Sequence, residues 1–236
     1  MAMTVAETDM RTFRWGKPLV VAIDGPSGTG KSSVSRETAL RLHAAYLDTG
    51  AMYRAVTWHC LDTGVDLADA AAIENACEEV DLAISTNPDD QKVSVGGRDV
   101  TEAIREPGIS KAVSAVATTL GARAELIRRQ KQTTADSGRR IVAEGRDITT
   151  VVAPGAEVRI LLTASEEPRL RRRGLQLGGT QSAEALKEQV LARDAKDSAV
   201  VNFQEAADGV FTVDSSHLDF EETVDAVLAV IRRATR

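Results

Sequence analysis

Short apolar runs alternate with longer stretches of mixed polarity along most of this chain. Five of the runs have the length and composition of buried strands, namely Leu19–Ile23, Ala44–Leu47, Arg140–Ala143, Val158–Thr163 and Val210–Val213. The stretches between them carry apolar residues at helical spacing. Strands that alternate with helices are typical of βαβ units, so the pattern predicts an α/β protein with a five-stranded parallel sheet flanked by helices.

The last predicted helix has the clearest pattern. Its apolar residues recur at intervals that place them on one face: Phe220, Val224, Val227, Leu228 and Ile231. Asp219, followed three residues later by Glu222, is typical of a capping pair at the start of a helix. We therefore expect this helix to pack against the sheet through that apolar face.

Residues 62–120 interrupt the strand–helix alternation. Three short runs inside this insert read as strands, at Asp81–Thr86, Lys92–Val95 and Arg98–Val100. Turn-forming residues separate them, including Gly96-Gly97. The insert therefore predicts a small antiparallel sheet that projects from the core.

A second insert occupies residues 166–196. It opens with Arg169, Arg171, Arg172 and Arg173 and then passes through Gly178-Gly179. A basic excursion with glycine hinges between two core elements indicates a mobile lid. An exposed amphipathic helix followed by a flexible loop is the alternative interpretation.

A glycine-rich segment follows the first predicted strand. Residues 25–32 read Gly-Pro-Ser-Gly-Thr-Gly-Lys-Ser and match G-x-x-x-x-G-K-[ST], the P-loop that binds nucleotide phosphates. A helical stretch comes next, so the motif has the strand–loop–helix context that it needs. Backbone N–H groups and the helix N-terminus favour phosphate oxygens there. Lys31 is expected to reach the β- and γ-phosphates, and the Ser32 hydroxyl is expected to be a ligand of Mg²⁺.

The segment therefore predicts that the chain binds a nucleoside triphosphate with Mg²⁺ as its cofactor. The candidate residues for this nucleotide are Gly25, Pro26, Ser27, Gly28, Thr29, Gly30, Lys31, Ser32 and Ser33.

Composition narrows the class of protein further. The net charge of −6 and an aromatic content of 3% argue against a nucleic-acid-binding module. No apolar run is long enough to span a membrane, and Cys60 and Cys77 lack metal-site spacing. We expect a cytoplasmic protein with reduced thiols. Residues 123–173 nevertheless hold 12 lysines and arginines against seven acidic residues, which suits a small anionic ligand in a cleft.

Charged clusters follow three of the predicted elements. Residues 48–54 come after the second strand, residues 144–147 after the third, and Arg193 and Asp197 lie at the end of the predicted lid. Ligands of open parallel sheets bind beyond the carboxyl ends of the strands, so these clusters predict an acceptor site for a second phosphate compound. A surface ion pair is the alternative for Arg193 and Asp197.

Phosphoryl transfer requires in-line positioning and cations rather than covalent chemistry from the protein. A phosphate acceptor already carries an anionic oxygen, so a general-base histidine is not needed. The scattered histidines therefore fit a kinase that acts on a phosphate monoester.

The chain resembles the bacterial cytidylate kinases, a group of nucleoside monophosphate kinases. The residues that carry the resemblance are 24–32, 47–54 (LDTGAMYR), 97–105, 122–130 and 144–147 (EGRD). It covers the chain from Leu19 to the C-terminus. The resemblance implies a P-loop NTPase fold with a small mixed α/β acceptor-binding insert and a short helical lid.

The resemblance also implies the reaction, which is transfer of the ATP γ-phosphoryl group to CMP or dCMP. It implies that Lys31, Arg146 and Arg193 are the catalytic residues. The implied acceptor residues are Thr49, Tyr53, Arg54, Ser114, Arg123, Arg146, Asp147, Arg193 and Asp197. Arg54, Arg146 and Arg193 would hold phosphates, and Asp197 the ribose. A monomer without nucleic-acid or membrane partners is expected.

Within this acceptor site, the resemblance implies that Ser114, Arg123 and Asp147 read the cytosine. A carboxylate and a guanidinium suit its amino and carbonyl groups. Uracil would leave the buried carboxylate facing a carbonyl oxygen, which supports discrimination between the bases.

The expected division of the chain is as follows: a disordered extension at 1–17, core with the P-loop at 18–61, the nucleoside monophosphate-binding insert at 62–120, core at 121–165, the lid at 166–196 and core at 197–236.

The sequence departs from the family pattern in three places. Thr49 replaces a serine and keeps its hydroxyl, and Glu144 replaces an aspartate. An arginine usual a few residues beyond Asp197 is missing, because no basic residue follows before Arg232. Two outcomes follow for the acceptor nucleotide: either one contact is lost, or another residue such as Arg171, Arg172 or Arg173 supplies it.

Two other functions remain open from the residues alone. One is a different small-molecule P-loop kinase, acting on UMP, dTMP or a metabolite hydroxyl. The other is a P-loop switch protein, although the Asn-Lys-x-Asp motif of guanine specificity is missing from the sequence.

Overall fold

The computed structural model describes residues 18–176 and 183–236, without the side chains of residues 176, 183–185, 189 and 193. The extension expected at 1–17 and the hinge expected at Gly178-Gly179 lie outside the described residues.

The central element is a parallel sheet of five strands in the order β2-β6-β1-β7-β8. Its strands are β1 (Leu19–Asp24), β2 (Ala45–Asp48), β6 (Arg140–Gly145), β7 (Val158–Thr163) and β8 (Phe211–Asp214). All five are the apolar runs that the sequence predicts, with boundaries that differ by at most two residues. The predicted α/β class and the parallel sheet are therefore confirmed.

The sheet is covered on both faces because its strands are apolar on both sides. In β1, Val20 and Ala22 face one core and Val21 and Ile23 face the other, and all four side chains are buried. Continuous apolar strands of this kind are typical of parallel sheets between two helical layers.

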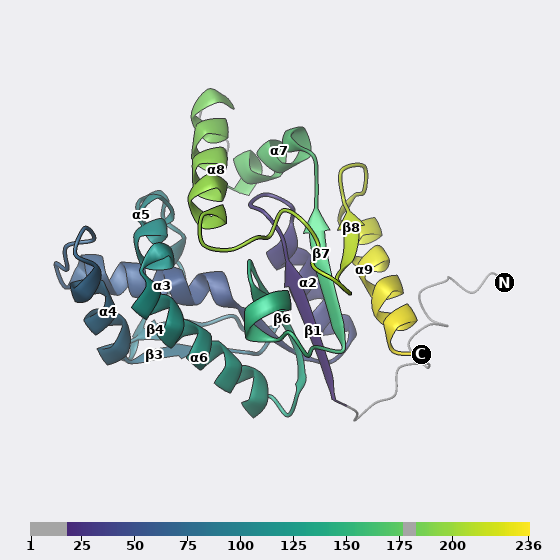
Figure 1. Cartoon of the computed structure of the whole chain (residues 1–236), viewed down its shortest axis with the longest axis horizontal. Coiled ribbons are helices and arrows are strands. Elements are labelled where there is room, and N and C mark those ends of the chain that lie inside the picture. The colour runs from purple at the N-terminus through teal and green to yellow at the C-terminus, as the bar shows by residue number, and fades with distance from the viewer. Residues whose placement is uncertain (1–17, 177–182) are drawn as a thin grey trace.

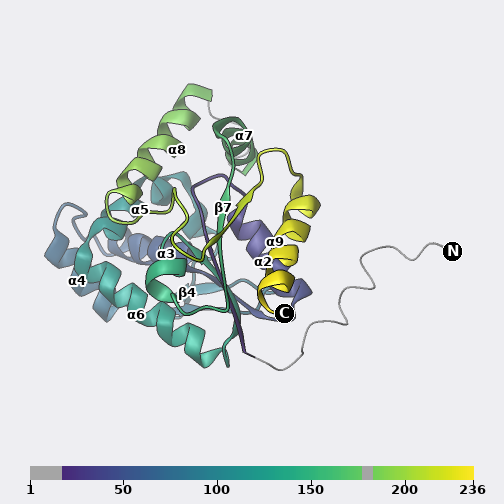
Figure 2. The ribbon, with the colours of Figure 1, turned by 45° about the vertical axis from the view of Figure 1, so that its right-hand side comes forward.

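Helices form these two layers (Figure 1). Helices α2 (Lys31–Arg41) and α9 (Phe220–Ala234) pack on one face of the sheet, and Figure 2 shows them side by side. The other layer contains α3 (Thr49–Asp62), α6 (Leu120–Asp136) and the short turn η3 (Ile148–Val152).

Helix α9 begins with the predicted cap. The Asp219 carboxylate accepts from the Glu222 N–H at 2.8 Å, and the Glu222 carboxylate accepts from the Asp219 N–H at 2.9 Å. The buried face contains Val224, Val227, Leu228 and Ile231. Phe220, at the first position of the helix, is 44% exposed and lines the cavity described below.

The insert at 62–120 contains the predicted antiparallel sheet in the order β3-β4-β5. Its elements are α4 (Ala70–Glu79), β3 (Leu82–Ile84), β4 (Val93–Val95), β5 (Arg98–Asp99), η2 (Ala103–Arg105) and α5 (Pro107–Thr118). The Tyr46 N–H on the edge strand β2 donates to the carbonyl of Thr86 at 2.9 Å, which attaches the insert to the sheet.

Two helices occupy the second insert, α7 (Glu166–Gln176) and α8 (Ala183–Ser198). Helix α8 packs against both α7 and α5, so it connects the second insert to the first. Both figures show this pair above the carboxyl ends of the strands.

Candidate active site

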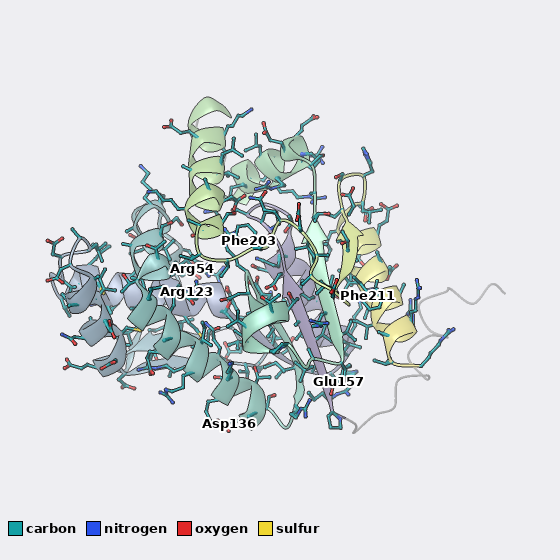
Figure 3. The ribbon with its side chains drawn as sticks, in the orientation of Figure 1. Arg54, Arg123, Asp136, Glu157, Phe203 and Phe211 are labelled. Carbon is teal, nitrogen blue, oxygen red and sulfur yellow. The ribbon has the colours of Figure 1, made fainter. Side chains whose placement is uncertain are left out.

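A cavity of about 1180 Å³ opens at the carboxyl ends of the strands. Its walls come from the P-loop, α2, α3, α5, β6, α6, α7, α8 and the segments that flank β8. Figure 3 shows Arg54, Arg123 and Phe203 around the middle of the molecule, whereas Asp136 and Glu157 lie at its lower edge. The predicted clusters therefore converge where an open parallel sheet places its ligands.

The P-loop forms one end of the cavity. Residues Pro26–Ser33 all line it, and α2 begins at Lys31 with its N-terminus toward the cavity. Gly28 and Gly30 have φ of 82° and 88°, a conformation that glycine adopts without strain. A Cβ at Gly28 would lie 2.5 Å from the carbonyl oxygen of Arg169, so α7 rests directly on the loop.

Glu144, at the end of β6, contacts both P-loop side chains that are expected to bind the nucleotide phosphates or Mg²⁺. Its carboxylate lies 2.7 Å from Lys31 Nζ and accepts from Ser32 Oγ at 2.6 Å. The side chain of Glu144 is buried, and burial raises its pKa although the Lys31 ammonium opposes the shift. In the sequence, Glu144 belongs to the charged cluster at 144–147 and departs from the family pattern, but its contacts with Lys31 and Ser32 were missed.

Oxygen ligands that suit Mg²⁺ gather at this point. The Ser32 hydroxyl and the Glu144 carboxylate are in contact, and Asp48 lies close enough to raise the pKa of Glu144. Hydroxyl and carboxylate oxygens are the donors that Mg²⁺ prefers, so the residues present fit this ion.

The start of α3 positions the first acceptor cluster. The Asp48 carboxylate caps the helix by accepting from the Ala51 N–H at 2.8 Å, and it pairs with Arg54 at 2.9 Å. Burial acts to raise the pKa of Asp48, but Arg54 and the Ala51 N–H hold it below its usual value. Thr49 donates to the Glu144 carbonyl at 2.8 Å and lines the cavity.

Two of the three expected base-reading residues meet in the cavity. Arg123 Nη2 lies 2.5 Å from Asp147 Oδ2, and both residues line the cavity with Tyr53. Burial raises the pKa of Asp147, against the effect of Arg123. Ser114 is buried on α5 but is not among the lining residues, which include Ser110 one turn earlier.

Arg146 is held on three sides. Its Nη1 lies 3.0 Å from Asp194 and its Nε 2.8 Å from Asp197, and its guanidinium stands 4.4 Å from the ring centre of Phe203. Such fixed surroundings reduce the reorganisation that phosphate binding would require. The side chain of Arg193, the remaining expected member of this group, lies outside the described residues.

Three arginines of α7 differ in their surroundings. Arg171 is exposed. The Arg172 guanidinium donates to the carbonyls of Thr29, Ser215 and Leu218, so it joins the P-loop to the segment after β8.

Arg173 lines the cavity, and its pKa is lowered by burial and then by the positive charge of Arg54. Two arginines so close together favour an anion between or beside them.

Asp24 links the P-loop strand to the acceptor cluster. Its buried carboxylate accepts from the Ile148 N–H at 2.9 Å, and from the N–H and hydroxyl of Thr149 at 2.8 and 2.6 Å. These residues follow Arg146 and Asp147 directly, so Asp24 fixes the turn that carries both. Burial raises the pKa of Asp24 to about 6.

Fold and site together define a P-loop protein that binds nucleotide phosphates and has the charged groups of a phosphotransferase. The cytidylate kinase family model matches residues 21–233. The chain therefore belongs to the cytidylate kinase family, which makes it a nucleoside monophosphate kinase.

Curated cytidylate kinases match this chain over nearly its whole length. The cytidylate kinase of Cutibacterium acnes is 47% identical over 91% of this chain and 96% of its own. That of Nocardia farcinica is 48% identical over 91% of this chain and 94% of its own.

A crystal structure of an uncharacterized protein from Eubacterium ventriosum aligns with a TM-score of 0.51 over 91% of this chain and 98% of its own, at 8% identity. That likeness concerns the fold alone. In the described part of the chain, no helix combines the length and apolar character that membrane crossing requires.

Proposed function

We propose that this chain transfers the γ-phosphoryl group of ATP to CMP or dCMP, giving ADP and CDP or dCDP. The observation that carries the proposal is the Arg123–Asp147 pair at 2.5 Å in the same cavity as the P-loop. One cavity thereby joins a triphosphate cradle to a pair that complements cytosine.

At the donor end, the backbone of the P-loop would bind the β- and γ-phosphates of ATP. Lys31 supplies a cation that moves from the Glu144 carboxylate to phosphate oxygens when the nucleotide binds. Mg²⁺, when bound, neutralises charge on the β- and γ-phosphates. Ser32 and Glu144 are the residues that would hold it.

At the acceptor end, Asp147 would accept a hydrogen bond from the cytosine amino group while Arg123 donates to the carbonyl oxygen. Arg54 and Arg146 would bind the acceptor phosphate, and Asp197 the ribose. Arg173 is our candidate for the arginine missing after Asp197, because it lines the same cavity beside Arg54.

The transfer needs these groups to hold the reactants in line and to neutralise charge, without forming a covalent bond to the protein. An oxygen of the CMP phosphate forms a bond to the γ-phosphorus, while the bond from that phosphorus to the β–γ bridging oxygen breaks and ADP leaves. Lys31, Arg146 and Arg193 would neutralise the charge on the transferred group. Side chains over the cavity would exclude water and so limit hydrolysis of ATP.

A coupled assay of ADP release tests the proposal. Purified protein with Mg²⁺ and ATP is offered CMP, dCMP, UMP, AMP, GMP and dTMP, and turnover confined to CMP and dCMP is expected. Turnover on a different acceptor would keep the kinase and discard the role of the Arg123–Asp147 pair. ATP hydrolysis without any acceptor at a comparable rate would contradict the exclusion of water.

A further inference from the structure

One buried carboxylate, that of Asp194, contacts residues from both ends of the cavity. This residue is 5% exposed and lies on α8, three positions before Asp197. Its Oδ1 accepts from the Ser27 N–H at 3.2 Å and lies 3.0 Å from Arg146 Nη1. The same oxygen thus contacts the backbone of the P-loop and an arginine of the proposed acceptor site.

The other oxygen of Asp194 closes a ring of contacts. Its Oδ2 pairs with Arg169 Nη2, and the Nε of Arg169 donates to the Ser27 carbonyl at 2.8 Å. Arg169 and Asp194 therefore hold both backbone polar groups of one P-loop residue, Ser27. We call Ser27, Arg169 and Asp194 the clasp.

The clasp joins three segments that are otherwise distant in sequence. Ser27 lies in the P-loop, Arg169 on α7 and Asp194 on α8, and the backbone of α7 touches Gly28 next to the clasp. Charge-assisted hydrogen bonds in buried surroundings are among the strong ones. A displacement of α8 therefore shifts the Ser27 peptide.

We propose that Asp194 is a positioning residue that couples occupancy of the acceptor site to occupancy of the P-loop. The inference rests on the proposed function. Acceptor phosphate bound to Arg146 fixes Asp194, and Asp194 in turn holds the Ser27 peptide in the conformation that binds the donor. Coupling of this kind is reciprocal, so ATP must strengthen CMP binding by the same factor.

Asp194→Asn tests the coupling, because it removes the charge and keeps the shape. Calorimetry measures the affinity for a non-hydrolysable ATP analogue with and without saturating CMP, and the ratio is the coupling factor. We expect a factor of about five or more in the unaltered protein and below about two in Asp194→Asn. Affinity for either ligand alone should change less than about threefold, whereas a merely structural role would weaken both and leave the ratio intact.

Two further variants complete the experiment. Glu188→Gln alters an exposed carboxylate of the same helix and should leave the coupling factor unchanged. Arg169→Lys serves as a second probe if Asp194→Asn does not fold, since one ammonium cannot contact both Ser27 and Asp194 as the guanidinium does. It should lower the coupling factor as well.

The failure of this inference is distinct from failure of the proposed function. A coupling factor near one in the unaltered protein, or an unchanged factor in both Asp194→Asn and Arg169→Lys, overturns the role of the clasp even when CMP is phosphorylated. Absence of ADP release with CMP overturns the proposed function instead.

Discussion

The two ends of the cavity are built in different ways. The donor end consists of one continuous segment, residues 25–33, whose backbone amides and glycine conformations form the cradle. The proposed acceptor end consists of side chains from α3, α6, α7, α8 and the turn after β6, held by ion pairs such as Arg123–Asp147 and Arg146–Asp197. Backbone recognition suits phosphates, which nucleotides share, whereas side chains provide selectivity among bases.

The comparison also separates the effects of substitution. Changes at the donor end should affect every acceptor alike, because they touch the group that is transferred. Changes at the acceptor end should alter which nucleotide is used.

Lys31→Ala should have the largest effect. It removes the cation expected on the transferred phosphoryl group, and turnover with every acceptor should fall by roughly 1000-fold, which corresponds to about 4 kcal/mol. Single-turnover ADP formation measures the loss. Lys111→Ala, which alters an exposed lysine on α5, is the control. A loss of less than tenfold with a folded protein would exclude the role of Lys31.

Asp147→Ala should have a smaller and selective effect. It removes the acceptor for the cytosine amino group and leaves Arg123 without its ion pair, so kcat/KM for CMP should fall about 100-fold while that for UMP changes much less. Competition between the two nucleotides in one reaction measures the ratio directly. Asp136→Ala, at the exposed end of α6, is the matched control. An equal loss for both nucleotides would assign Asp147 a general rather than a selective role.

Gly28→Ala probes the contact between the P-loop and α7. Gly28 and Gly64 have similar positive φ, 82° and 73°, but a Cβ at Gly64 meets nothing within 4 Å. Both alanines carry the same backbone strain, so the difference between them isolates the collision with the Arg169 carbonyl. We expect Gly28→Ala to be less stable than Gly64→Ala by about 2 kcal/mol in urea unfolding. Equal stability would mean that α7 leaves the loop at little cost.

The donor end could be predicted from sequence because its determinants are contiguous. The apolar run of β1, the glycines and Lys31 stand side by side, and each element follows from local patterns. The five core strands were predicted for the same reason. Phe220 lies in the predicted helix but is 44% exposed, because periodicity identifies a helical face and not how completely each residue on it is covered.

Much of the acceptor end depended on resemblance, and the clasp escaped prediction. Asp194 lies within the charged cluster predicted at residues 193–197, but it stands 25 positions from Arg169 and 167 from Ser27, and nothing in that cluster indicates either partner. Arg172 could not be distinguished from its neighbours, because only the fold brings the three carbonyls to its guanidinium. A buried ion pair needs partners that the chain supplies only after folding. The charge excess of residues 123–173 and the cluster at 193–197 indicated charged groups near a ligand, but not which of them pair.

Asp24 ends β1, directly before the P-loop, and binds the turn after Arg146 and Asp147, so it connects the two ends. Its titration should have the smallest of the predicted effects. Its carboxylate has a pKa of about 6 in the folded chain against an ordinary value of 3.8, so the folded state binds the proton more tightly than the unfolded state does. Its contribution to the free energy of unfolding is therefore fully present below pH 3.8 and falls as the pH rises toward 6. Between about pH 4.5 and pH 6 the loss should be about 1.5 kcal/mol.

Urea unfolding at a series of pH values, with Asp24→Asn beside the unaltered protein, isolates this contribution. The variant carries no titrating group at this position, so its free energy of unfolding should lack the decline, whatever constant difference the amide introduces. Other carboxylates titrate equally in both proteins and cancel in the comparison. Parallel curves would mean that the hydrogen bonds from Ile148 and Thr149 offset burial and hold the pKa of Asp24 near its unfolded value. The Asp24 carboxylate would then stay charged over this pH range.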